Sequence, residues 1–187
     1  MPNNKANVST TRGVQGGYFF RAATTVTGPT TTSWTPGADW SCLGYIPEDG
    51  FTESVSADNT TSLRDINLDL VDEVTGSYTE TIQVGLMEIA KSPLGVIFGS
   101  SNVTDSAGLL KVEHKWGASD ETMSYVLLLL LKDSRKWIKY IPAGKVTERG
   151  DFTGNKTTAA SRTVTITYLN DANGMGCVDL IDSTETS

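Results

Sequence analysis

The segment from Leu63 to Glu88 alternates apolar and polar residues with a period of two, as expected of β-strands buried on one face only. It contains two such runs, separated by the turn-forming sequence Thr75-Gly76-Ser77. We therefore predict a β-hairpin with one apolar face and one face rich in carboxylates, hydroxyls and amides. The residues predicted on the polar face are Asp65, Asn67, Asp69 and Glu73 from the first strand and Thr79, Thr81 and Gln83 from the second.

Further strand patterns follow along the chain, in which threonine is over-represented. The range 123–132 is apolar on both faces and should form a central strand that is covered on both sides. Pro142 should end the strand before it, because proline has no backbone N–H to donate. The strands that we predict outside the hairpin lie at 18–23, 51–56, 110–116, 123–132, 135–141, 146–148 and 162–169.

A single helix is predicted between these strands. Ser92 is suited to cap it, Pro93 to be its first residue and Gly99 to end it, and the sequence also allows a start upstream of Pro93, around Met87 to Ala90. With one short α-helix and about eight strands, the sequence predicts a mainly β fold, either a β-sandwich or a partly rolled barrel.

The chain of 187 residues is long enough for one domain with a real core. Trp34 lies in a loop rich in threonine, glycine and proline, where it either meets a partner surface or packs back on its own core. The sequence leaves both alternatives open. We predict a single domain over 1–187, with an N-terminal arm at 1–16, a long loop at 24–48 and a C-terminal tail at 170–187.

The net charge of −7 argues against adhesion to nucleic acid or to anionic lipid. The longest apolar run, 126–131, is far too short to span a bilayer as a helix, and we expect neither a signal peptide nor membrane contact. Cys42 and Cys177 are far apart in the sequence, so a disulfide framework is not expected and synthesis in a reducing compartment is the simpler interpretation.

Residues suited to catalysis are scarce. The one histidine, His114, lies between Val112 and Trp116 at an apolar position of its strand pattern, which favours a packing role over a catalytic one. Asp65 and Asp69 project from a predicted polar face, whereas a carboxyl group that acts as a general acid is usually buried. Without nucleotide, calcium or zinc motifs, the sequence predicts no enzyme, no cofactor and no metal site.

Three segments, in this order and spacing, resemble the tail tube (major tail) proteins of long-tailed, non-contractile bacteriophages. They are 43–51, with its acidic-glycine turn before a strand; 80–99, a strand followed by a short helix; and 136–174, ending in a threonine-rich strand. The resemblance implies hexameric rings stacked into a tube, with strands joined into a continuous barrel around a DNA channel. It also implies a place in the virion tail after synthesis in the host cytoplasm, and contacts with a tape measure protein and tail-end proteins.

The charge of DNA suggests which residues would line such a channel. A duplex carries one negative charge per roughly 1.7 Å, so lysine or arginine on the wall would bind it, whereas acidic and hydroxyl groups would let it pass. The channel-lining candidates are the seven polar residues of the predicted hairpin, although the sequence also allows the alternative that they face the tube exterior. The inter-subunit contact candidates are Trp34, Asp58, Asn59 and Thr60.

One alternative function is a carbohydrate-binding or adhesion β-sandwich. In that case the side chains of Trp34, Trp40 and Trp116 would offer stacking faces for sugars.

Overall fold

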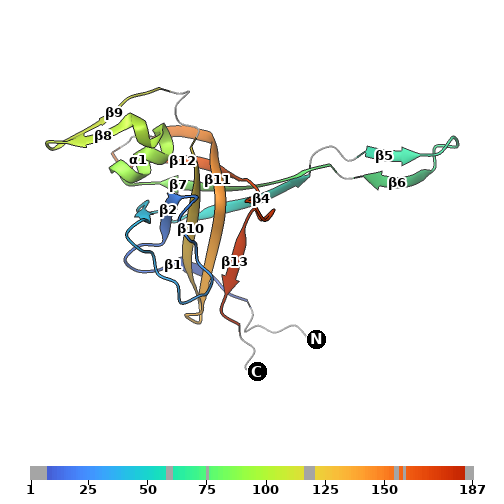
Figure 1. Ribbon diagram of the computed structural model, residues 1–187, viewed down its shortest axis with the longest axis horizontal. Coiled ribbons are helices and arrows are strands. Elements are labelled where there is room, and N and C mark those ends of the chain that lie inside the picture. The colour runs from blue at the N-terminus through green and yellow to red at the C-terminus, as the bar shows by residue number, and fades with distance from the viewer. Residues whose placement is uncertain are drawn as a thin grey trace.

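The fold is mainly β, with one short α-helix, as the sequence predicts (Figure 1). A nine-stranded antiparallel sheet forms the body, and two separate two-stranded hairpins extend from it. This computed structural model describes residues 8–57, 61–74, 76–115, 121–153, 156–157 and 159–183.

The large sheet places strands from all parts of the chain side by side. β1 (Thr11–Gly13), within the predicted N-terminal arm, pairs with the end of β10, and β13 (Val178–Ile181), within the predicted C-terminal tail, pairs with the start of β11. The main path runs β3 (Ser41–Cys42), β2 (Phe19–Ala23), β10 (Thr122–Leu131), β11 (Lys136–Thr153), β12 (Ser161–Tyr168), β7 (Tyr78–Leu86) and β4 (Phe51–Ala57).

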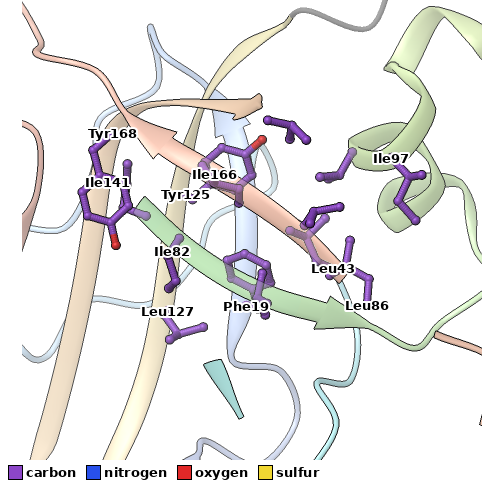
Figure 2. Packing of buried hydrophobic residues seen from close by; sticks show 14 of the residues in the cluster. Phe19, Leu43, Ile82, Leu86, Ile97, Tyr125, Leu127, Ile141, Ile166 and Tyr168 are labelled. Carbon is purple, nitrogen blue, oxygen red and sulfur yellow. The ribbon is translucent and has the colours of Figure 1, made fainter. Parts of the chain in front are cut away.

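The core lies on both sides of β10, as its doubly apolar sequence predicts. Tyr125 and Leu127 point into the larger cluster, where they pack with Phe19, Ile82 and residues of β11 and β12 (Figure 2). Val126 and Leu128 point to the opposite face, where the loop carrying Trp40 covers them. The sheet therefore has one deeply buried face and a second face that is covered only in part.

The helix α1 (Lys91–Phe98) covers one end of the larger cluster, against which Val96 and Ile97 are buried. Gly99 ends the helix with a φ of 88°, a left-handed conformation that glycine adopts without strain, so the predicted end is confirmed. The helix begins upstream of Pro93, which is the alternative that the sequence allows, and Ala90 rather than Ser92 is the capping residue.

Downstream of α1, a 3₁₀ turn (Ser100–Asn102) leads into the hairpin of β8 (Val103–Ser106) and β9 (Leu109–Val112). The strand predicted over 110–116 is therefore shorter than expected, and Trp116 lies outside the described residues.

The prediction that Pro142 ends a strand is wrong, since β11 continues through it to Thr153. The register with β10 shifts at this point, so Pro142 lies at a β-bulge where the ladder does not require its missing N–H. The buried Ser124 hydroxyl donates a hydrogen bond of 2.7 Å to the Pro142 carbonyl and holds the bulge. The predicted strand at 146–148 is part of the same long strand.

The hairpin predicted over 63–88 is also wrong. β7 pairs with β4 and β12, whereas β5 (Thr61–Arg64) and β6 (Leu70–Val74) pair with each other beyond the end of the main sheet (Figure 1). Thr75, in the predicted turn, lies outside the described residues. We call residues 61–74 the arm.

Residues 65–69 form the tip of the arm rather than a strand. The Asp65 carboxylate oxygen Oδ1 accepts hydrogen bonds from the backbone N–H groups of Asn67 and Asp69, at 2.8 and 2.9 Å. Such a turn, in which a side chain captures the backbone beyond it, competes directly with strand pairing. The alternation of apolar and polar residues in this segment therefore does not correspond to two faces of a strand.

Candidate channel wall and assembly surfaces

One face of the sheet is dense in hydroxyl groups over four adjacent strands. The pairing register brings Ser54 and Thr167 to either side of Thr81, and Thr52 and Thr165 to either side of Gln83. We call this surface the hydroxyl face. Its residues are Thr52, Ser54 and Ser56 on β4; Thr79, Thr81 and Gln83 on β7; Thr163, Thr165 and Thr167 on β12; and Lys145, Thr147 and Glu148 on β11.

The period of two in β7 and β12 explains this arrangement. Ile82 and Val84 alternate with the polar residues of β7, and Val164 and Ile166 with those of β12, and all four are buried in the larger core cluster. Because successive side chains of a strand point to opposite faces, the threonines must lie on the side away from that core.

Side-chain hydrogen bonds link strands β11 and β12 across the hydroxyl face. The hydroxyl oxygens of Thr147 and Thr167 lie 2.8 Å apart, and the Thr165 hydroxyl donates to Glu148 Oε2 at 3.2 Å. The charges of Lys145 and Glu148 balance, so the set of residues that defines this face carries no net charge. It is a polar surface without net charge.

The structure separates the channel-lining candidates into two groups. Thr79, Thr81 and Gln83 lie on the hydroxyl face. The other group, Asp65, Asn67, Asp69 and Glu73, lies on the arm.

The contributions of β4, β11 and β12 to the hydroxyl face were missed at the level of sequence. The alternation Thr163, Thr165 and Thr167 was visible, but no local signal shows that β12 lies beside β7.

Among the inter-subunit contact candidates, Trp34 packs on its own core. Its ring meets Trp40 edge-on, with ring centroids 5.3 Å apart, and both belong to the smaller cluster on the second face of the sheet. Trp40 is buried and offers no stacking face for a sugar. Asp58, Asn59 and Thr60 lie outside the described residues.

β4 is the last strand of the sheet on one side. It pairs with β7 along Phe51–Ala57, and within the described part of the chain no strand pairs with its other edge. An open edge of this length presents unpaired backbone N–H and C=O groups, which another chain can pair with.

A buried lysine joins the C-terminal strand β13 to the edge strand β4. Lys139 is only 2% exposed, and its ammonium group lies 2.9 Å from Glu53 and 3.0 Å from Asp179. The Tyr168 hydroxyl donates a second hydrogen bond to Glu53, at 2.8 Å. Burial lowers the pKa of Lys139, but the hydrogen bonds to the two carboxylates outweigh it and the pKa lies above its usual value. This site was also missed in the sequence.

The cysteines and the histidine, which have nucleophilic or acid–base potential, do not form a catalytic arrangement among the described residues. Cys42 and Cys177 are free thiols, and burial raises the pKa of Cys177 to about 12, which keeps it protonated at neutral pH. His114 is exposed, and its ring lies 4.5 Å from the Phe98 ring, centroid to centroid.

No helix in the described part of the chain is long and apolar enough to cross a membrane.

Comparison with known protein families shows to which family the chain belongs. The family described as "Phage tail tube protein" matches residues 1–185. The chain belongs to the phage tail tube protein family. This tail tube protein is a structural component of the virion tail that forms the tube, and it is not an enzyme.

Two solved structures resemble the tail tube protein. One is a chain of the "Virion of native gene transfer agent (GTA) particle", with 11% identity, a TM-score of 0.42, and coverage of 79% of this chain and 92% of that chain. Another belongs to the "Extracellular Contractile Injection System, PVC sheath-tube complex in extended state", with 13% identity, a TM-score of 0.41, and coverage of 90% and 92%. No curated protein sequence matches the chain.

Proposed function

We propose that the hydroxyl face lines the channel of a tube built from stacked hexameric rings, and that DNA passes along this face during ejection. The observation that carries the proposal is the continuous hydroxyl surface over β4, β7, β11 and β12, which has no excess of positive charge. In this proposal the tail is long and non-contractile, as the resemblance in the sequence implies.

The physical reason is the charge density of the cargo. Each phosphate contact made by a fixed cation releases counterions and contributes affinity, so a wall of lysines would hold the duplex. Threonine and serine hydroxyls hydrogen-bond to water and carry no charge, so they hydrate the wall without gripping the phosphates. Glu148 lies beside Lys145 on the same strand and offsets the one cation of the set.

The open edge of β4 suggests how neighbouring subunits join. If β4 pairs with the sheet of the next subunit in the ring, the hydroxyl faces become one continuous inner wall and the free edge disappears. Trp34, Asp58, Asn59 and Thr60 remain candidates for further contacts between subunits.

In this proposal the acidic residues of the arm contribute less to the channel wall than the hydroxyl face does. Asp65, Asn67, Asp69 and Glu73 reach the channel only where the arm borders it, and there their negative charge would repel DNA at distances within about 8 Å at physiological salt. A tape measure protein inside the growing tube and tail-end proteins at its ends complete the proposed set of partners.

Lysines placed on the hydroxyl face test the proposal. Thr81→Lys combined with Thr165→Lys adds two cations per subunit on adjacent strands of the hydroxyl face. Repetition of the subunit along the tube multiplies these charges. We expect tubes of normal length in which DNA release, followed by dye fluorescence after receptor-triggered ejection, is slower and more sensitive to salt.

Two further variants serve as comparisons. Thr104→Lys, on the exposed strand β8, adds a cation outside the hydroxyl face and should leave release unchanged. Asp69→Lys tests the arm in the same way and keeps the Asp65 carboxylate that holds the turn at its tip. Release at the normal rate from Thr81→Lys/Thr165→Lys tubes would remove the hydroxyl face from the channel wall.

A further inference from the structure

Large apolar side chains are exposed at two opposite ends of the molecule. On the arm, the side chain of Ile66 is 97% exposed and that of Leu68 is 74% exposed. The helix α1 and the β8–β9 hairpin lie at the other end (Figure 1). Leu109 on β9 is exposed there, as are Ile89 and Phe152, which line one cavity together with residues of α1. Concentrations of exposed apolar surface of this kind mark interaction sites.

The turn at the tip of the arm has a close counterpart elsewhere in the chain. In residues 171–175, Asp171 Oδ1 accepts hydrogen bonds from the N–H groups of Asn173 and Met175 at 2.8 and 2.9 Å, the same pattern and distances as at Asp65. Asp-Ala-Asn-Gly begins this second turn, and Asp-Ile-Asn-Leu begins the arm turn.

Because the turn at 171–175 forms without large apolar residues at its second and fourth positions, the arm turn does not need Ile66 and Leu68 in order to form. Gly174 has a φ of 78°, and Leu68, at the equivalent position, has a φ of 69°. A left-handed conformation costs a residue with a Cβ atom about 1–2 kcal/mol, which glycine avoids. A strained and exposed leucine at a site that suits glycine indicates a role outside the subunit.

An apolar groove lies at the opposite end of the molecule. It encloses about 400 Å³ between α1, the end of β7 and strand β9, a volume typical of a small binding pocket. The Arg162 guanidinium lies over the rings of Phe98 and Phe152, 5.3 and 5.9 Å from their centroids, and forms one wall. Most of the remaining lining is apolar: Leu86, Leu94, Ile97, Leu110, Val112 and Ala160.

We propose that Ile66 and Leu68 at the tip of the arm insert into this groove of a second copy of the chain. The elements that line the groove, α1 and β9, lie at the opposite end of the molecule from the arm (Figure 1), so one subunit cannot fill its own groove. The contact is therefore heterologous, and each subunit uses its arm toward one neighbour and its groove toward another, which generates a repeating assembly. The inference deepens the proposed tube assembly and rests on it.

The charges beside the two surfaces are compatible with this contact. The arm carries Asp65, Asp69, Asp72 and Glu73 against the single cation Arg64. Arg162 contributes a permanent cation to the groove, where Glu88 and His114 are the other titratable lining residues. An acidic tip thus approaches an apolar cavity that has a guanidinium on its wall.

The first test removes the apolar tip while keeping the turn. Ile66→Ala with Leu68→Gly reproduces the residues Ala172 and Gly174 of the second turn, so the subunit should fold with unchanged or slightly higher stability toward urea. Since each buried aliphatic side chain is worth a factor of ten or more in affinity, the concentration for half-maximal assembly should rise at least about tenfold. Met175→Ala, in the second turn, is the matched control and should assemble normally.

A second variant blocks the groove instead. Ala160→Trp fills the cavity and should weaken assembly to a similar extent. When the two variants are mixed, the intact arm of Ala160→Trp meets the intact groove of the other. Light scattering coupled to size exclusion should therefore show larger assemblies than either variant forms alone, but smaller ones than the wild type forms. Normal assembly of either variant alone would refute the contact between arm and groove. It would do so even if some other molecule occupied the groove.

Cross-linking tests the same contact without relying on weakened assembly. With Cys42→Ser as background, Ile66→Cys and Ala160→Cys together should give a disulfide-linked ladder in assembled tubes, and neither cysteine alone should do so. Tubes that assemble without a ladder would overturn the docking but not the hydroxyl channel wall. Conversely, a ladder combined with normal DNA release from Thr81→Lys/Thr165→Lys tubes would overturn the channel wall alone.

Discussion

At the scale of single residues, Lys139 is the side chain with the most demanding environment. Its ammonium is buried and held by Glu53 from β4 and Asp179 from β13, strands that are far apart in the sequence. Nothing around Lys139 in the sequence distinguishes it from an exposed strand lysine such as Lys136. A buried charge is tolerated only when its partners are in place, and those partners are supplied by the tertiary pairing of strands.

Replacing Lys139 by methionine should destabilise the subunit. The variant keeps most of the side-chain volume but leaves Glu53 and Asp179 without their cation, for which we expect a loss of about 2–3 kcal/mol in urea unfolding. The estimate is at the low end for a buried pair because both carboxylates are partly exposed. Lys136→Met, at an exposed position of the same strand, should change stability by less than about 0.5 kcal/mol. Equal effects of the two variants would show that the buried pair contributes nothing.

The contribution of Lys139 should also depend on pH. Its pKa is higher in the folded subunit than in the unfolded chain, so its stabilising effect is complete below the unfolded lysine value of about 10.4 and declines as the pH rises through the folded pKa. The stability difference between the wild type and Lys139→Met should therefore be constant from neutral pH to about pH 10 and narrow above it. If the stability difference between the wild type and Lys139→Met instead narrows between pH 7 and 9, the pKa of Lys139 is not raised in the folded subunit.

At the scale of elements, the sequence predicted the strands whose apolar periodicity is regular, but it did not predict the places where the backbone departs from that periodicity. β10 and β12 were predicted correctly because their apolar periodicity extends over the whole strand and matches the burial that tertiary pairing imposes. The arm tip was mispredicted because Asp65 captures its own backbone, and β11 because a bulge accommodates Pro142. At the arm tip a local hydrogen bond outweighs the pattern, whereas the bulge in β11 is held by a hydrogen bond from Ser124 on the neighbouring strand.

The bulge in β11 gives a prediction at this scale. Ser124→Ala removes the buried hydroxyl that donates to the Pro142 carbonyl and leaves that carbonyl unsatisfied, so we expect a loss of about 1–3 kcal/mol in thermal or urea unfolding. Ser54→Ala, on the exposed face of β4, removes a hydroxyl in contact with solvent and should be close to neutral. If the two substitutions have the same effect, the hydroxyl of Ser124 does not stabilise the bulge.

At the scale of the whole molecule, the hydroxyl face exists only because four strands lie in a particular register. The sequence correctly indicated a polar, hydroxyl-rich side of β7, and its resemblance to tail tube proteins is confirmed by the family. It could not show that β4, β11 and β12 extend that side into a surface, nor that the acidic residues of the predicted hairpin belong to a separate arm. These features depend on contacts between distant parts of the chain, which no local pattern encodes.

A three-dimensional reconstruction of assembled tubes by electron cryomicroscopy tests the central claim most directly. We predict that Thr81 and Thr165 lie on the inner wall, with β4 of each subunit paired to the sheet of its neighbour. A reconstruction in which these threonines lie on the outer surface of the tube, or are buried between rings, would contradict the proposal.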